Sequence, residues 1–253
     1  LIHDDVMDRS RERRHRPTVW ALWSSDQAIN AGDGLYALAN LAVARLLGAE
    51  VPASKAVRAA QVLSQACLWT AEGQVLDMAF AGREHVTTAE YLTMIAHKTG
   101  ALIEAATKIG ALLSSDEEPV IRAYAQFGRD LGLAFQVRDD YLGVWGDEAA
   151  TGKSATGDIR EKKKSYPVLV AFERAGAADQ ETLRCIYAQE TLSDRDVADV
   201  QGILERCGAI AETDRIASEY SERALAHLDA TGVANPTQDE LRQLAVFLIR
   251  RAY

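Results

Sequence analysis

The sequence has few cysteines and prolines and no long apolar run, and each shortage excludes a class of protein. Its three cysteines are far apart among 253 residues and form no CxxC pair, which excludes a disulfide framework and favours a reducing compartment. No run of about eighteen apolar residues occurs, so we expect no stable membrane insertion. Only five prolines are present, and no linker is evident. We therefore expect a cytoplasmic protein with one domain over residues 1–253.

The chain has more acidic than basic residues, which argues against nucleic acid and anionic membranes as partners. Lysine and arginine number 28 against 37 aspartates and glutamates, a formal net charge of −9. Such a chain repels the phosphates of nucleic acid and of anionic membranes, so we expect no nucleic-acid partner. The 48% of hydrophobic residues is enough for a sizeable core and excludes a disordered chain.

Apolar residues recur at helical spacing along nearly the whole chain, and no segment alternates with the period of a strand. This pattern predicts an all-α fold of roughly eight to ten helices, a single large helical bundle around a central active-site cavity. Residues 37–47 are apolar around most of the helix circumference, which predicts an interior position. We expect helices over residues 28–47, 55–80, 87–109, 118–145 and 167–173, with capping boxes at Thr87/Glu90, Ser193/Asp196 and Thr237/Glu240.

A first acidic cluster opens the chain with Asp4, Asp5 and Asp8. On a helix Asp4 and Asp8 share a face, where like charges repel by a few tenths of a kcal/mol (about 0.2–0.5) unless a cation neutralises them. Carboxylate oxygens select Mg²⁺ over softer metals. Taken alone, the cluster fits an exposed acidic helix end equally well.

A second acidic cluster, Asp139 and Asp140, interrupts an otherwise apolar helix, and Gln136 shares a face with Asp140. Burying an unpaired carboxylate costs several kcal/mol, roughly 3–5, so this pair calls for a neutralising partner. That partner is either a metal ion or the neighbouring Arg138.

Basic residues follow each acidic cluster. This order suits metal-bound phosphates, because carboxylates hold the metal while arginine and lysine take the remaining phosphate oxygens. The residues concerned are Arg9, Arg11, Arg13, Arg14 and Arg16 after the first cluster, and Lys153, Arg160, Lys162, Lys163 and Lys164 after the second.

These motifs together resemble the trans-isoprenyl diphosphate synthases, also called polyprenyl synthetases. The resemblance covers nearly the whole chain, because six motifs occur in the family's order. They are the acidic segment 1–8 with Arg13-Arg14, Gly32-Asp33, Gly73-Gln74-x-x-Asp77, Lys98-Thr99, Phe135-Gln136-x-x-Asp139-Asp140, and Gly152-Lys153 with the basic segment 158–167.

The resemblance implies a prenyltransferase that condenses isopentenyl diphosphate with an allylic diphosphate to give a longer trans-polyprenyl diphosphate, with Mg²⁺ as cofactor. It also implies a homodimer. By the same resemblance, Asp4, Asp8 and Asp139 bind Mg²⁺ directly, and Asp5 and Asp140 assist either through water or from the second shell of ligands. The allylic diphosphate is bound by Arg13, Lys98, Lys153 and one lysine of the 162–164 run, for which we choose Lys163, and isopentenyl diphosphate by Arg14. Thr99 and Gln136 stabilise the carbocation and guide proton loss.

Three departures from the family pattern stand out. Gly143 replaces a third aspartate of the second motif, and His15 replaces the usual glycine after the arginine pair. The family's upstream isopentenyl diphosphate segment and its product-length determinants do not precede Leu1. We therefore expect the expressed protein to carry roughly 70–100 further residues in two or three N-terminal helices.

Two other functions share parts of this pattern. A class I terpene cyclase has the same fold and one aspartate motif, but its Asn/Asp-x-x-Ser/Thr-x-x-x-Glu motif is absent from residues 135–150. A non-catalytic subunit of a heteromeric synthase typically loses an acidic motif, and both motifs are kept here. Both remain as alternatives.

Overall fold

The structure is a computed structural model that describes residues 1–146 and 156–250, and it divides into two compact units, Leu1–Gln65 and Ala66–Tyr253. The first unit contains one short hairpin and three helices before α4 begins. Its elements are α1 (Ile2–Met7), β1 (Glu12–Arg13), β2 (Arg16–Pro17), α2 (Val19–Leu22), α3 (Ser25–Ala44) and a 3-10 turn (Arg45–Gly48). Helix α4 (Ala53–Gly82) continues into the second unit.

The second unit is helical throughout its described part. Its elements are α5 (Thr88–Ile95), the π-helical turn η2 (Ala96–Gly100), α6 (Ala101–Ser114), α7 (Glu118–Trp145), α9 (Gly157–Arg160), α10 (Tyr166–Arg174), α11 (Ala177–Ala188), α12 (Asp194–Arg206), α13 (Ala209–Asp229) and α14 (Pro236–Arg250). The all-α prediction is confirmed. The described residues form thirteen α-helices, more than the eight to ten expected, because short helices separate the long ones.

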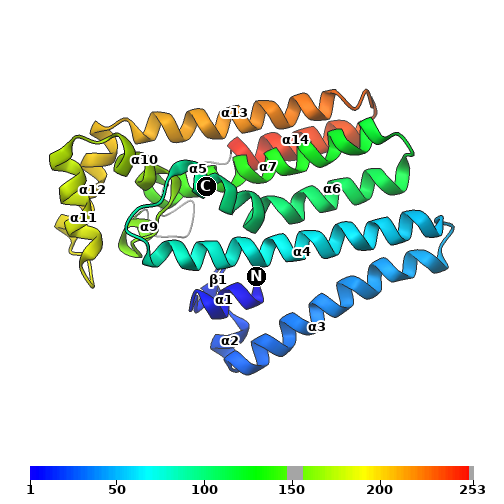
Figure 1. Ribbon diagram of the computed structural model, residues 1–253, viewed down its shortest axis with the longest axis horizontal. Helices are drawn as coiled ribbons and strands as arrows, with labels where there is room; N and C mark the ends of the chain where they lie inside the picture. The colour runs from blue at the N-terminus through cyan, green and yellow to red at the C-terminus, as the bar shows by residue number, and fades with distance from the viewer. Residues whose placement is uncertain (147–155, 251–253) are drawn as a thin grey trace. The chain divides into compact units, whose positions relative to one another are not determined.

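Helix α7 organises the core of the second unit. It packs against α6 and α13, which run alongside it in Figure 1. Phe127, Leu131 and Ala134 form one buried cluster with residues of α13 and α14. Further along the helix, Val137 and Val144 belong to a second cluster that includes residues of α10, α11 and α12. Residues 135–145 of α7 therefore lie on a rigid support.

The predicted helix starts are confirmed at two of the three capping boxes. Thr87 and Ser193 each accept the backbone N–H of the third helical residue, which returns the bond. The capping box predicted at Thr237 is wrong, because α14 already begins at Pro236. Asn235 Oδ1 accepts the Gln238 N–H at 2.8 Å instead. Asparagine before a proline at the first helical position is a stronger start than a threonine inside the helix.

The interior position predicted for residues 37–47 is wrong. Leu38, Leu41 and Leu47 are each more than half exposed, and within α3 only Ala28 is buried. The apolar pattern correctly predicts a helix, but hydrophobicity alone does not say what covers it.

The hairpin that follows α1 has a strained turn. Arg13 pairs with Arg16, so Arg14 and His15 form a two-residue loop. Both have positive φ, 51° and 59°, as the favoured two-residue turns with both central residues left-handed require. Glycine adopts this conformation freely, whereas a side chain makes it cost about 1–2 kcal/mol. His15 therefore stands at a position suited to the glycine that the family pattern has there.

We expect His15→Gly to raise the midpoint of thermal unfolding by about 2 °C, because relief of about 1–2 kcal/mol of strain exceeds glycine's entropic cost of about 0.5–1 kcal/mol. His15→Ala is the matched control, since it removes the imidazole but keeps the Cβ and should leave the midpoint unchanged. Calorimetry on the three proteins measures this. An equal rise in both variants would show that the imidazole, and not the backbone, carries the strain.

Candidate active site

In the first acidic cluster, the three aspartates have different environments. Asp5 is buried, and Arg13 donates to its Oδ1 from both Nε and Nη2 at 2.7 Å. Asp4 is half-buried and Asp8, at the C-terminus of α1, is exposed. Asp5 thus fixes the arginine predicted to bind diphosphate, while Asp4 and Asp8 are the more accessible carboxylates.

The Gly32-Asp33 motif supports α1 within the same unit. His3 Nε2 lies 3.1 Å from the Ile29 carbonyl and 3.4 Å from Asp33 Oδ1. A Cβ on Gly32 would lie only 2.2 Å from the His3 ring. The glycine therefore lets the acidic helix approach α3 closely, which explains a signature whose role the sequence left open.

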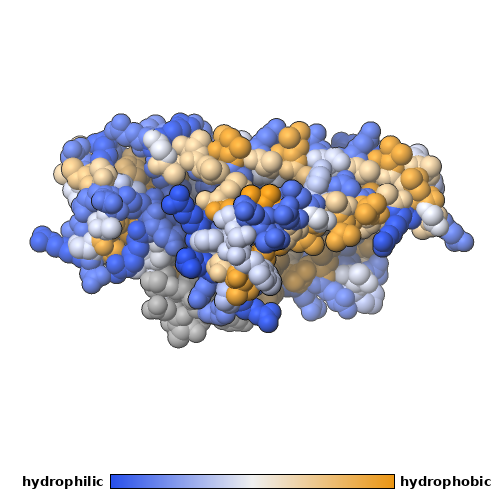
Figure 2. Space-filling view, turned by 90° about the horizontal axis from the view of Figure 1, so that it is seen from below, coloured by the Kyte–Doolittle hydropathy of each residue, from blue (hydrophilic) through white to orange (hydrophobic). Residues whose placement is uncertain are grey.

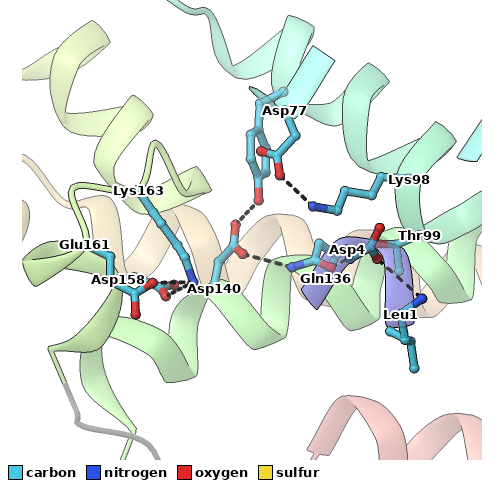
Figure 3. A network of polar contacts seen from close by, with 11 residues as sticks. Leu1, Asp4, Asp77, Lys98, Thr99, Gln136, Asp140, Asp158, Glu161 and Lys163 are labelled. Carbon is cyan, nitrogen blue, oxygen red and sulfur yellow. Dashed lines mark hydrogen bonds and ion pairs between the residues drawn. The ribbon is translucent and has the colours of Figure 1, made fainter. Parts of the chain in front are cut away.

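In the second cluster, Asp140 is buried and both of its oxygens accept hydrogen bonds. The Tyr91 hydroxyl donates to Oδ2 at 2.5 Å and the Tyr166 backbone N–H to the same oxygen at 2.9 Å. Gln136 Nε2 donates to Oδ1 at 3.2 Å (Figure 3). Burial and the charge of Asp158 raise the pKa of Asp140 to about 7, against the effect of these donors. Asp140 is thus a structural carboxylate held by three elements.

Asp139 has a more open setting than Asp140. It is half-buried on α7 and has polar contacts of its own. Arg138, the alternative partner, donates to Asp214 on α13 at 2.9 Å and lies over the Tyr141 ring. Arg138 is not among the donors to Asp140. Of the two carboxylates in the second cluster, Asp139 is therefore the less buried.

Lys98 and Thr99 extend from the π turn η2 to two different helices. Lys98 Nζ lies 2.6 Å from Asp77 Oδ2 on α4, and Thr99 Oγ1 donates to Gln136 Oε1 at 2.9 Å. Because Gln136 also donates to Asp140, a continuous hydrogen-bonded chain joins Thr99 to the buried carboxylate (Figure 3). The structure thus brings three of the predicted site residues together.

The three lysines of the basic segment after α9, Lys162 to Lys164, have different kinds of partner. Lys162 bonds the Gln189 carbonyl and Lys164 the Phe80 carbonyl, so both stabilise the loop. Lys163 Nζ lies 3.2 Å from Asp158 Oδ1 and 2.9 Å from Glu161 Oε2. Burial opposes its charge, but these carboxylates prevail and hold the pKa of Lys163 above its usual range. Lys153, also predicted to bind diphosphate, lies outside the described residues.

Gly143 makes room for Asp158. A Cβ at this position would lie 2.2 Å from Asp158 Oδ2. The chain therefore places an aspartate from a different element beside the position where many family members have their third aspartate.

Sequence reasoning missed Tyr91 and the Tyr166 amide, and it gave Asp77 and Asp158 no role. Tyr91 looks like an ordinary core residue of an apolar helix, and a backbone amide carries no signal at all. Asp158 could have been suspected from its place beside the lysine run.

No ready-made metal site is present within the described ranges, where no three histidine, cysteine or acidic side chains gather around one point. A surface hollow of about 480 Å³ lies elsewhere, and neither acidic cluster lines it. Its lining residues are Glu84, His85, Phe172, Glu173, Gln180 and Arg184. The central active-site cavity stays a prediction.

Comparison with known proteins identifies the family. The polyprenyl synthetase family model matches residues 1–204. The chain belongs to the polyprenyl synthetase family. It is 38% identical to the short chain isoprenyl diphosphate synthase of Methanothermobacter thermautotrophicus, over 100% of this chain and 76% of that protein. It is 35% identical to the (2E,6E)-farnesyl diphosphate synthase of Mycobacterium bovis, over 99% and 69% of the two chains.

The fold of this polyprenyl synthetase matches solved structures of the family. The geranylgeranyl pyrophosphate synthetase of Pyrococcus horikoshii Ot3 superposes with a TM-score of 0.91 at 36% identity, over 99% of this chain and 75% of that one. The isoprenoid-synthase fold and the assignment as a trans-prenyl diphosphate synthase are therefore confirmed. The terpene cyclase and the non-catalytic subunit are not favoured. No helix among the described residues is long and apolar enough to span a membrane.

We expect Tyr91→Phe to lower turnover by about tenfold, because Asp140 loses a charged hydrogen bond worth about 1.5–3 kcal/mol and no longer holds Gln136 firmly. Tyr166→Phe is the matched control, since it keeps the backbone N–H that Asp140 accepts. Steady-state kinetics on both variants measures the difference. Equal losses in the two would mean that the Tyr91 hydroxyl has no special part in the network.

Proposed function

We propose that this polyprenyl synthetase condenses isopentenyl diphosphate with an allylic diphosphate, in a Mg²⁺-dependent reaction that yields a longer trans-polyprenyl diphosphate. The observation that carries the proposal is the hydrogen-bonded chain from Thr99 through Gln136 to Asp140, with Lys98 and Lys163 as cations of the same unit. Relatives bear the names of farnesyl, geranylgeranyl and geranylfarnesyl diphosphate synthases. Their products differ in length, so we propose chain elongation and not one product.

The donor set suits Mg²⁺. Asp4, Asp8 and Asp139 would supply hard carboxylate oxygens to the ion. Asp5 and Asp140 already accept hydrogen bonds from Arg13 and from Tyr91 and Tyr166, so they would act by orienting neighbouring groups. When bound, Mg²⁺ neutralises charge on the leaving diphosphate. Arg13, Lys98, Lys153 and Lys163 are proposed to hold the allylic diphosphate, and Arg14 the isopentenyl diphosphate.

The reaction begins when the allylic C–O bond breaks and the diphosphate leaves with the electron pair. Lys98 and Lys163 stabilise the negative charge that develops on the leaving oxygen. Thr99 Oγ1 and Gln136 Oε1, held in one hydrogen bond, present lone pairs to the allylic carbocation. The double bond of isopentenyl diphosphate then attacks the cation, and the departing diphosphate accepts the proton that is lost.

We expect Asp4→Asn and Asp139→Asn each to lower turnover by about 10²–10³-fold, since each removes a proposed metal ligand and the loss of one electrostatic stabiliser typically costs that much. Asp179→Asn is the control, because Asp179 pairs only with Arg206 among its described partners. The assay follows elongation of C5, C10 and C15 allylic diphosphates with isopentenyl diphosphate and Mg²⁺. Near-normal turnover in either variant would refute the metal assignment.

The same assay separates the alternative functions. A terpene cyclase would release diphosphate from an allylic substrate without isopentenyl diphosphate, and a non-catalytic subunit would show no turnover by itself. A cytoplasmic location and a single domain over residues 1–253 remain predictions, which rest on cysteine use and on the absence of an evident linker.

We also propose a homodimer that pairs through α3 and α4. Apolar side chains on α3 are exposed in the single chain, among them Leu35, Leu38 and Leu41. Figure 2 shows apolar patches on the face seen from below. Such patches mark interaction surfaces, and self-association with twofold symmetry is the commonest way to cover them.

We expect light scattering at micromolar concentration to give about twice the 27.6 kDa of this chain. Replacing Leu38 and Leu41 with Asp should yield monomers, because charges would be buried in the interface. Leu244→Asp, a change at another exposed leucine, on α14, is the control and should leave the dimer intact. A wild-type protein that stays monomeric would contradict the proposal.

A further inference from the structure

The helical run from Thr88 to Ser114 contains a π turn, η2, at the position of Lys98 and Thr99. Single π turns inside α-helices are rare and occur often at functional sites. Here the turn sends two consecutive side chains to separate partners, Lys98 to Asp77 on α4 and Thr99 to Gln136 on α7. The placement of both groups therefore depends on what holds this turn.

On one side the turn lies directly against the backbone of α4 at Gly73. A Cβ on Gly73 would lie 2.3 Å from the Lys98 nitrogen, 2.7 Å from the Lys98 Cα and 2.9 Å from the His97 carbonyl carbon. These are backbone atoms, so no rotation of a flexible side chain could relieve the clash. Any larger residue at position 73 must displace Lys98 itself.

On the other side the turn lies against α7 at Gly132. A Cβ there would lie 2.7 Å from the Gly100 Cα and 3.3 Å from its nitrogen. Ala96 and Gly100, which bound the turn, are both buried. The π turn is thus clamped between two helix backbones, at the residues next to Lys98 and Thr99.

We propose that Gly73 and Gly132 are positioning residues, which clamp the π turn so that the Lys98 ammonium and the Thr99 hydroxyl face the reacting diphosphate and allylic carbon. Neither glycine has a side chain with which to bind substrate. Gly73 acts through Lys98, and Gly132 acts through Gly100 on Thr99. The clamp follows from the close approach of the backbones, whereas its effect on turnover rests on the proposed function.

The chain offers a matched control for tight packing alone. Gly128, also on α7, is as crowded as the clamp glycines, because a Cβ there would lie 2.3 Å from Thr107 Oγ1 and 2.7 Å from the Ile103 carbonyl oxygen. It faces α6 beyond the π turn. Gly110 on α6 has nothing within 4 Å and serves as the neutral glycine.

The test measures kcat at saturating substrate, per folded protein, for Gly73→Ala, Gly132→Ala, Gly128→Ala and Gly110→Ala. We expect the two clamp variants to lose about 10²-fold in kcat, the usual effect of misplacing a catalytic group by about 1 Å. Gly128→Ala should lower the unfolding midpoint but keep kcat within about threefold, and Gly110→Ala should change neither. A loss in Gly128→Ala equal to that in Gly73→Ala would overturn the proposal.

A double-mutant cycle shows whether Gly73 acts through Lys98. In a Lys98→Ala background, Gly73→Ala should lower kcat by clearly less than about 10²-fold, because one of the two groups that the turn positions is gone. A full 10²-fold loss in both backgrounds would show that Gly73 serves general packing and would overturn its role.

Hydrogen exchange tests the clamp without reference to activity. In the wild-type protein, amides of residues 96–100 should exchange as slowly as those of α6, and exchange as fast as in residues 115–117 would overturn the clamp. In Gly73→Ala the same amides should exchange at least about tenfold faster, with no change in Gly110→Ala. A wild-type protein that is inactive but whose turn exchanges slowly would contradict the proposed function and not the clamp. If a clamp variant fails to fold, the exchange rates of the wild-type protein test the clamp.

Discussion

A buried carboxylate near the C-terminal end of α7 is the constraint around which the second unit is built. Asp140 cannot stay ionised in the core unless donors surround it, and α5, α7 and α10 each supply one. The hydrogen bonds to Asp140 therefore connect α5, α7 and α10, which are far apart in the sequence. Asp140, the more buried residue of the acidic pair, thus holds Gln136 and through it Thr99, while Asp139 beside it is only half-buried.

Close approach of another segment to a glycine is the second recurring feature. Gly32 admits the ring of His3, Gly73 admits the backbone of Lys98, and Gly143 admits the carboxylate of Asp158. Two of these glycines belong to family signatures. Each lets a charged or polar group come nearer than any other residue would permit. The signatures are therefore best understood as pairs, a glycine on one element and a functional residue on another.

Much of the fold and the site could be predicted from the sequence, where local chemistry decides the outcome. The long helix over residues 118–145 and the capping boxes at Thr87 and Ser193 were predicted correctly, because periodicity and side-chain capping are local signals. The exposed face of α3, the strained turn at His15 and the donors to Asp140 depend on contacts between distant segments. Spacing alone could not reveal them. The split between Asp139 and Asp140 is of this kind, since adjacent aspartates look alike in sequence.

We propose that Asp140 organises the site and that Asp139 binds Mg²⁺. A crystal structure with Mg²⁺ and an unreactive allylic diphosphate analogue tests it most directly. We predict an Asp139 oxygen about 2.0–2.1 Å from Mg²⁺, with both oxygens of Asp140 still accepting from Tyr91, Tyr166 and Gln136. An Asp140 oxygen bound to Mg²⁺ at that distance, with the Tyr91 hydroxyl released, would contradict it.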